Sequence, residues 1–101
     1  LELGCRGAVG SSYNFAANIY HPILEAYKQR DLETANLWQD RSIQTIDIIA
    51  AHGYLPAAKA VMKMLGVACG PARPPLGNLT ETAKASLKAE LEDIGFFDWI
   101  S

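Results

Sequence analysis

The stretch from Gly4 to Asn14 limits the possible fold more than any other part of the chain. Ala8 and Val9 suit an extended, buried segment, and the neighbouring glycines let another backbone or a ligand approach closely. Four side chains that can form hydrogen bonds follow in a row: Ser11, Ser12, Tyr13 and Asn14. In α/β proteins, ligand sites lie where buried strands open into such loops before a helix. We therefore predict a strand and a polar turn over residues 4–14.

The rest of the chain has the pattern of helices and loops, so this strand has no partner. Apolar residues at three- and four-residue spacing predict a helix over residues 15–30. Pro22 should lie in its first turn, since a proline deeper inside would remove a hydrogen bond, and Asn18 is then a candidate cap. A single strand cannot satisfy its backbone groups without a sheet. We therefore interpret the chain as a piece of a larger α/β protein that starts at a truncated end.

Asp31 is a good N-cap for a second helix that runs to about His52, with Gly53 as its left-handed end. Its predicted core face consists of Ala35, Trp38, Ile43, Ile46, Ile49 and Ala50. Pro56 suits the first position of a third helix that closes at Gly66.

The segment from 67 to 79 contains three prolines and two glycines, which predicts an ordered loop. We expect Val67, Leu76 and Leu79 to hold that loop on the core. Thr80 is the predicted N-cap of a fourth helix that ends at Gly95, and the aromatic terminus after it should be docked. The expected content is one short strand and about four helices, so the chain itself is mostly α.

Composition excludes several classes of protein. Half of the 101 residues are apolar and 20% are charged, as in an ordinary globular domain. Nine basic residues are scattered among eleven acidic ones, so no basic stripe suggests nucleic-acid binding. No long apolar run suggests a membrane span, and no leader suggests secretion. Cys5 and Cys69 are too few for a disulfide framework, which favours a reducing, cytoplasmic compartment.

The chain offers no obvious metal site or catalytic lysine of its own. His21 and His52 are far apart and have no ligand partners at metal-binding spacing. Lys59 lies among apolar residues, as a Schiff-base lysine can. However, Lys59 and Lys63 are four residues apart on one helical face, which is typical of solvent-facing lysines.

Three motifs together resemble a known family. Gly7-Ala8-Val9-Gly10-Ser11-Ser12-Tyr13-Asn14 resembles the last barrel strand of the N-acetylneuraminate lyases, within the dihydrodipicolinate synthase/N-acetylneuraminate lyase family. The segment from Leu55 to Val61 resembles a late helix of this family. Gly70 to Leu76 resembles its Gly-x-x-Arg-x-Pro-Leu loop. The resemblance covers nearly the whole chain in the right order.

The resemblance implies the C-terminal part of a (β/α)₈ barrel, a fold of about 250 residues. Residues 1–101 would form one segment, with the last barrel strand and polar turn at 4–14, the last barrel helix at 15–30 and appended helices at 31–101. The implied activity is class I aldolase cleavage of N-acetylneuraminate to N-acetylmannosamine and pyruvate. The Schiff-base lysine and the proton-transferring tyrosine lie on earlier strands, so this segment should be inactive alone.

One role carries over to individual residues. Ser11 matches the serine that hydrogen-bonds the polyol part of the sugar acid, and Gly10 matches the glycine beside it. A hydroxyl suits a polyhydroxylated ligand because it both donates and accepts. Arg6 departs from the aspartate that the family often has, which puts any supporting role of that position in doubt.

The resemblance calls for no cofactor and no metal. Its implied partners are the rest of the barrel, a small sugar acid and further copies of the protein in a homo-oligomer, a tetramer by family likeness. A dihydrodipicolinate synthase or another pyruvate-dependent aldolase is the nearest alternative, although those synthases tend to have an apolar residue at position 11. A non-catalytic helical interaction module is the alternative from another class.

Overall fold

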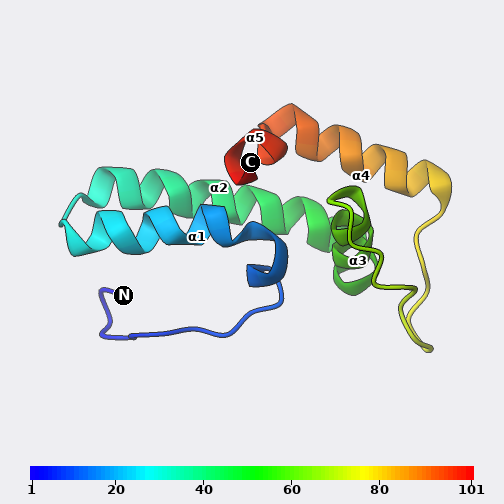
Figure 1. Ribbon diagram of the computed structural model, residues 1–101, viewed down its shortest axis with the longest axis horizontal. Coiled ribbons are helices and arrows are strands. Elements are labelled where there is room, and N and C mark those ends of the chain that lie inside the picture. The colour runs from blue at the N-terminus through cyan, green and yellow to red at the C-terminus, as the bar shows by residue number, and fades with distance from the viewer.

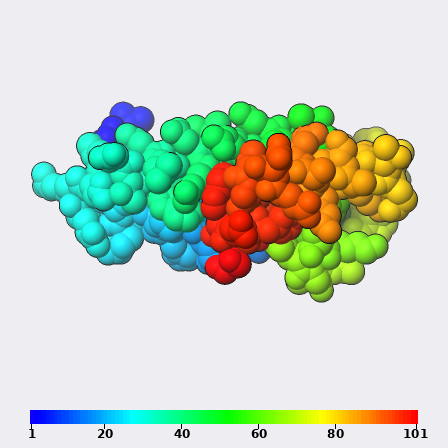
Figure 2. All heavy atoms as spheres, turned by 90° about the horizontal axis from the view of Figure 1, so that it is seen from above, coloured from blue at the N-terminus to red at the C-terminus, as the bar shows by residue number.

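The computed structural model describes all 101 residues and contains five helices and no strand (Figure 1). The helices are α1 (Tyr13–Lys28), α2 (Leu32–Ala51), α3 (Tyr54–Met64), α4 (Glu81–Ile94) and α5 (Phe96–Ile100). α1 and α2 form an antiparallel pair, and α4 and α5 lie along one side of α2 (Figures 1 and 2). The molecule is elongated, with extents of 43 × 27 × 22 Å. None of its helices combines the length and apolarity that crossing a membrane would need.

The predicted strand within residues 4–14 is absent. The segment from Cys5 to Gly10 runs past α1 without touching another extended segment, and all of its residues are exposed (Figure 1). No backbone N–H group from Cys5 to Ser12 donates a hydrogen bond within the chain. A strand exists through the ladder that it shares with a neighbour, and this chain supplies no neighbour. The polar turn does form, because the Tyr13 N–H donates to the Gly10 carbonyl at 3.2 Å.

The placement of Pro22 differs from the prediction. α1 begins at Tyr13, bends at Ala16 (φ −124°, ψ 23°) and continues through Pro22 to Lys28. Proline costs the helix one hydrogen bond. The helix persists because Ile19 and Ala26, on either side of the proline, are both buried. Asn18 does not cap the helix, since its Nδ2 donates to the Ile100 carbonyl at 2.7 Å.

The ends of α2 are confirmed, but its buried face is rotated from the predicted one. Asp31 caps the helix by accepting a hydrogen bond from the Thr34 N–H, and Gly53 follows its end at φ 84°. Ile43, a predicted core residue, is 48% exposed. Ser42 and Thr45 are buried instead, because the buried line follows the spacing 35, 42, 45 and 49. Thr45 is accommodated there because its hydroxyl donates to the Arg41 carbonyl.

The third helix and the loop after it also differ in detail from the prediction. α3 begins at Tyr54, so Pro56 is its third residue, and it ends just before Leu65 and Gly66. The loop is ordered, but Val67 and Leu76 are about half exposed. Ala72 is the buried residue of this loop, and its N–H donates to Asn78 Oδ1 at 2.8 Å.

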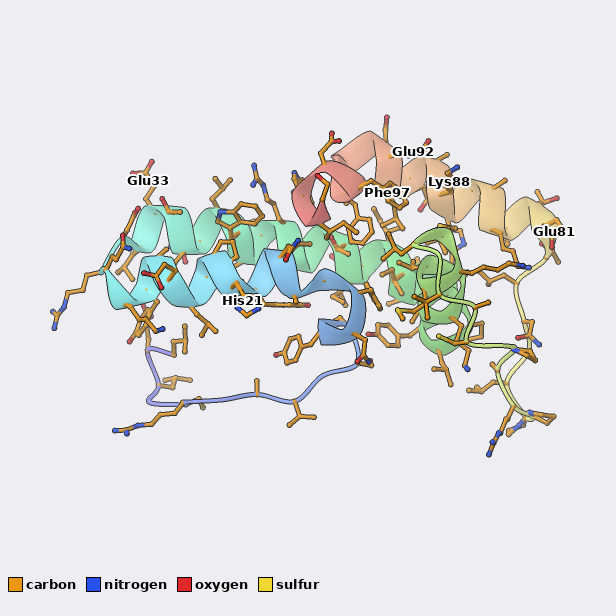
Figure 3. All side chains as sticks on the ribbon, in the orientation of Figure 1. His21, Glu33, Glu81, Lys88, Glu92 and Phe97 are labelled. Carbon is orange, nitrogen blue, oxygen red and sulfur yellow. The ribbon has the colours of Figure 1, made fainter.

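The C-terminal segment is docked, as predicted, and forms the fifth helix. Thr80 caps α4 by accepting a hydrogen bond from the Ala83 N–H, and Gly95 ends it in the left-handed conformation. Phe96 is fully buried, and Phe97 packs beside it against the core (Figure 3). The Arg41 guanidinium lies over the Trp99 ring at 5.0 Å and over the Trp38 ring at 4.3 Å. This contact attaches α5 to α2.

The pH dependence of stability provides a test of the Asp31 cap. The side chain of Thr34, and next its backbone N–H, hold the pKa of the Asp31 carboxyl below its ordinary value of 3.8. The stabilisation is therefore present above pH 3.8 and is lost as the pH falls through the lowered pKa. We expect Asp31→Asn, which keeps an N-cap oxygen, to lack this component. Urea unfolding of the wild-type chain and of Asp31→Asn from pH 7 to pH 2 measures this difference. If the unfolding free energies of the two proteins changed with pH in parallel, the role of the Asp31 charge would be contradicted.

Candidate functional site

Two adjacent serines form the turn after the extended segment, and their surroundings differ sharply. Ser12 is 7% exposed, and its Oγ lies 2.8 Å from the Tyr20 hydroxyl of α1. Ser11 is exposed, and its Oγ donates to the Tyr54 hydroxyl at 2.7 Å. Ser12 therefore fastens the turn to α1, while Ser11 presents its hydroxyl at the surface. Ser11 does not bond its own backbone, which is the ordinary role of a turn serine.

Gly10 lies in the open beside Ser11. A Cβ atom built on Gly10 would meet the Tyr13 ring at 3.4 Å, the inner limit of an ordinary contact. Tyr13 in turn packs edge-on against Tyr20, with ring centroids 4.5 Å apart. Asn14 closes the turn because its Nδ2 donates to the Ser11 carbonyl at 3.0 Å. Tyr13 and Asn14 thus have structural roles, and the Tyr13 ring packs against Gly10.

Sequence reasoning missed Tyr54, which the fold places against Ser11 from 43 residues away. Tyr54 is the first residue of α3, directly after Gly53, and its ring packs on the core. The only local sign of this role is that a tyrosine stands at the start of a helix, where its ring can pack on the core while its hydroxyl reaches beyond it. Tyr20 falls among the apolar residues at helical spacing in residues 15–30, and its hydroxyl holds Ser12.

A hollow of about 540 Å³ separates the extended segment from α1. Its wall on the segment side includes Cys5, Arg6 and Ala8, and its wall on α1 includes Tyr20 and Leu24. His21 points from α1 toward the extended segment, across this space (Figure 3). The extended segment runs on the side of α1 away from α4 and α5 (Figure 1), and most of the lining of the hollow is apolar. In this chain no side chain fills it.

A second hollow, of about 380 Å³, is lined by Lys59, Lys63 and Lys84. Lys59 Nζ donates to the Cys69 carbonyl at 3.4 Å, which ties the loop to α3. Lys84 Nζ lies 3.0 Å from a carboxylate oxygen of Glu81. Lys84, by hydrogen bond and charge, holds the pKa of the Glu81 carboxyl below its ordinary value, and Lys63 adds to the effect. Two of the three lysines are thus already engaged within the fold.

Metal ligands do not gather anywhere in the chain. No group of three or more His, Cys, Asp or Glu side chains lies close enough to hold an ion. His21 faces the first hollow, whereas His52 Nε2 lies 3.2 Å from Glu90 Oε2 and links the end of α2 to α4. The two cysteines are free and exposed.

An unpaired extended segment, a polar turn and a helix follow one another from residue 5 to residue 28, which is the order of elements in one unit of an α/β protein. Comparison with known proteins gives the family. The model of the dihydrodipicolinate synthetase family matches residues 1–94. The chain belongs to this family.

The relatives are aldolase-family lyases of greater length. The chain is 35% identical to N-acetylneuraminate lyase of Rattus norvegicus over 101 residues, which cover 98% of this chain and 32% of the relative. It is 35% identical to the enzyme of Mus musculus over 98 residues. The structure of Proteus mirabilis N-acetylneuraminate lyase superposes with a TM-score of 0.87 at 33% identity, covering 94% of this chain and 32% of that one. The chain therefore spans about a third of the length of these relatives.

The two serines of the turn should respond differently to the same substitution. Ser12→Ala leaves the half-buried Tyr20 hydroxyl without its partner, which we expect to cost about 1–2 kcal/mol of unfolding free energy. Ser11→Ala removes an exposed hydroxyl and should change it by less than about 0.5 kcal/mol. Urea unfolding followed by circular dichroism compares the two variants. Equal losses would show that Ser11 is as structural as Ser12.

Proposed function

We propose that this chain is the last third of a class I pyruvate aldolase that cleaves N-acetylneuraminate to N-acetylmannosamine and pyruvate. Residues 4–14 serve as the last barrel strand and its turn, 15–30 as the last barrel helix, and 31–101 as appended helices. The observation that carries the proposal is the exposed Ser11 hydroxyl at the end of the extended segment, next to Gly10. The similarity to N-acetylneuraminate lyases supports this substrate.

The position of Ser11 suits the polyol end of a sugar acid. A serine hydroxyl has one donor and two acceptor sites, and because Ser11 donates its proton to Tyr54, its oxygen is left to accept from a substrate hydroxyl. Gly10 contributes space, because it has no side chain of its own next to Ser11. The Ser12–Tyr20 pair holds the turn in place from behind, so the Ser11 hydroxyl is presented by a fixed backbone. Ser11 and Gly10 are the residues that this segment contributes to substrate binding.

The chemistry itself belongs to other parts of the complete protein. In the reaction that the family resemblance implies, a lysine forms a Schiff base with pyruvate and a tyrosine moves protons while the carbon–carbon bond breaks. Neither comes from this segment. Lys59 is no substitute, because its ammonium binds the Cys69 carbonyl in a loop that belongs to the appended helices. The segment alone is therefore inactive.

The rest of the barrel is the first partner of this segment. Val9 and Leu3 are 103% and 96% exposed, and the backbone donors beside Val9 have no acceptor. When neighbouring strands pair with residues 4–10, the backbone donors gain acceptors. When apolar side chains fill the hollow next to α1, the exposed apolar residues become buried. The complete protein then assembles into a homo-oligomer.

A dihydrodipicolinate synthase, or another aldolase of the same fold, is the closest competing function, because the matching family model carries that name. The exposed serine at position 11 favours the sugar acid over it. A helical interaction module would instead use exposed apolar residues such as Leu37 and Leu55. The unpaired backbone of residues 5–10 favours the barrel segment over the module, because in a free-standing module these backbone groups would have no strand to pair with.

Activity of the complete protein tests the proposed function. We expect a protein that ends in this chain to release pyruvate from N-acetylneuraminate, and borohydride with pyruvate to trap a covalent adduct on it. The 101-residue chain should do neither. Condensation of pyruvate with an amino-aldehyde, without cleavage of the sugar acid, would instead establish the synthase reaction. Pyruvate release by the chain alone would refute its proposed inactivity.

Val9→Asp tests the contact with the rest of the barrel. In the 101-residue chain Val9 touches nothing, so the charge should change the unfolding free energy by less than about 0.5 kcal/mol. In the complete protein the same carboxylate would be buried beside neighbouring strands, and we expect a loss of at least about 3 kcal/mol or no soluble protein. Val67→Asp is the matched control, since Val67 is half exposed in the loop after α3. Equal tolerance of both changes in the complete protein would contradict the contact.

A further inference from the structure

We propose that Tyr54 is a positioning residue for Ser11, and that it makes Ser11 an acceptor for a hydroxyl of the substrate's polyol chain. This role rests on the proposed function, because it concerns the same serine. It extends that function by adding a residue from the appended helices to the substrate site. It also specifies which hydrogen-bonding sense Ser11 offers.

The hydrogen bond between Ser11 and Tyr54 joins the turn to the start of α3, 43 residues further along the chain. Ser11 Oγ and the Tyr54 hydroxyl lie 2.7 Å apart, the usual distance of a hydroxyl–hydroxyl hydrogen bond. The Tyr54 ring packs against the buried cluster, and its backbone begins α3 directly after Gly53 at φ 84°. The ring is therefore held by the core while its hydroxyl extends to the turn. A group held in this way can fix the rotamer of an exposed serine.

The direction of the hydrogen bond determines what remains for a ligand. Ser11 donates its only proton to Tyr54, so the serine oxygen keeps lone pairs and no donor. Such an oxygen accepts from an O–H group and repels a carboxylate. The polyol chain of a sugar acid supplies O–H groups, whereas pyruvate, the other half of the substrate, has none. Tyr54 should therefore influence recognition of the polyol half alone.

Other hydroxyls near the turn do not compete for this role. Ser12 is buried and its Oγ is bonded to the Tyr20 hydroxyl, so Ser12 does not reach a ligand. The Tyr13 ring covers the side of Gly10 and stacks edge-on against Tyr20. Ser11 is the exposed serine of the turn, and Tyr54 is the group that orients it.

Tyr54→Phe in the complete protein tests the proposal, because it removes the hydroxyl and keeps the ring. We expect KM for N-acetylneuraminate to rise about tenfold, the effect of one neutral hydrogen bond. KM and kcat for a short 4-hydroxy-2-oxo acid without a polyol chain should stay within about twofold of wild type. Tyr27→Phe is the matched control, since Tyr27 is a half-buried tyrosine of α1 whose hydroxyl forms no hydrogen bond in this chain.

The double variant Ser11→Ala/Tyr54→Phe provides the second readout. If Tyr54 acts through Ser11, the double variant should be no worse on N-acetylneuraminate than Ser11→Ala alone. An unchanged KM in Tyr54→Phe, equal losses on both substrates, or additive losses in the double variant would each overturn the positioning role. A wild-type protein that cleaves neither substrate would overturn the proposed function itself, and that result differs from all three.

Discussion

Burial of one line of side chains on α2 holds the other helices in place. Ile49 is fully buried on this line, in one cluster with Ile19 of α1, Val61 of α3 and Leu87 of α4. Burying an aliphatic side chain of this size contributes about 1.5–3 kcal/mol. α2 packs against α1, α3 and α4, so its buried line is where their apolar faces meet. The helical part of the chain therefore has a core of its own, although it lacks a sheet.

The candidate site depends on that core. The turn at Ser11 and Ser12 is fastened by two tyrosine hydroxyls, one from α1 and one from α3. Both tyrosine rings pack against the buried cluster around α2. The position of the turn is thus set by helix packing, even though the segment before it has no hydrogen-bonding partner. The helices hold the C-terminal end of the extended segment in place, and the neighbouring strands of the proposed barrel would hold the rest of it.

Local chemistry made several elements predictable. Asp31 and Thr80 each supply an oxygen to an N–H group three residues on, and Gly95 adopts the left-handed conformation that ends α4. These features depend on neighbours in sequence, so the sequence specifies them directly. The strand was predicted wrongly for the opposite reason. Its pattern is that of a buried strand, but pairing requires a second segment that this chain does not contain.

The sequence by itself determined both ends of α2 and of α4, the polar turn and, through three motifs in order, the family. Only the tertiary structure decided which residues share the core and the site. It buried Ser42 and Thr45 in place of Ile43, because the packing angle of the neighbouring helices selects the face of α2. It also carried α1 through Pro22 and brought Tyr54 to Ser11. These outcomes depend on contacts between distant residues, which no local spacing encodes.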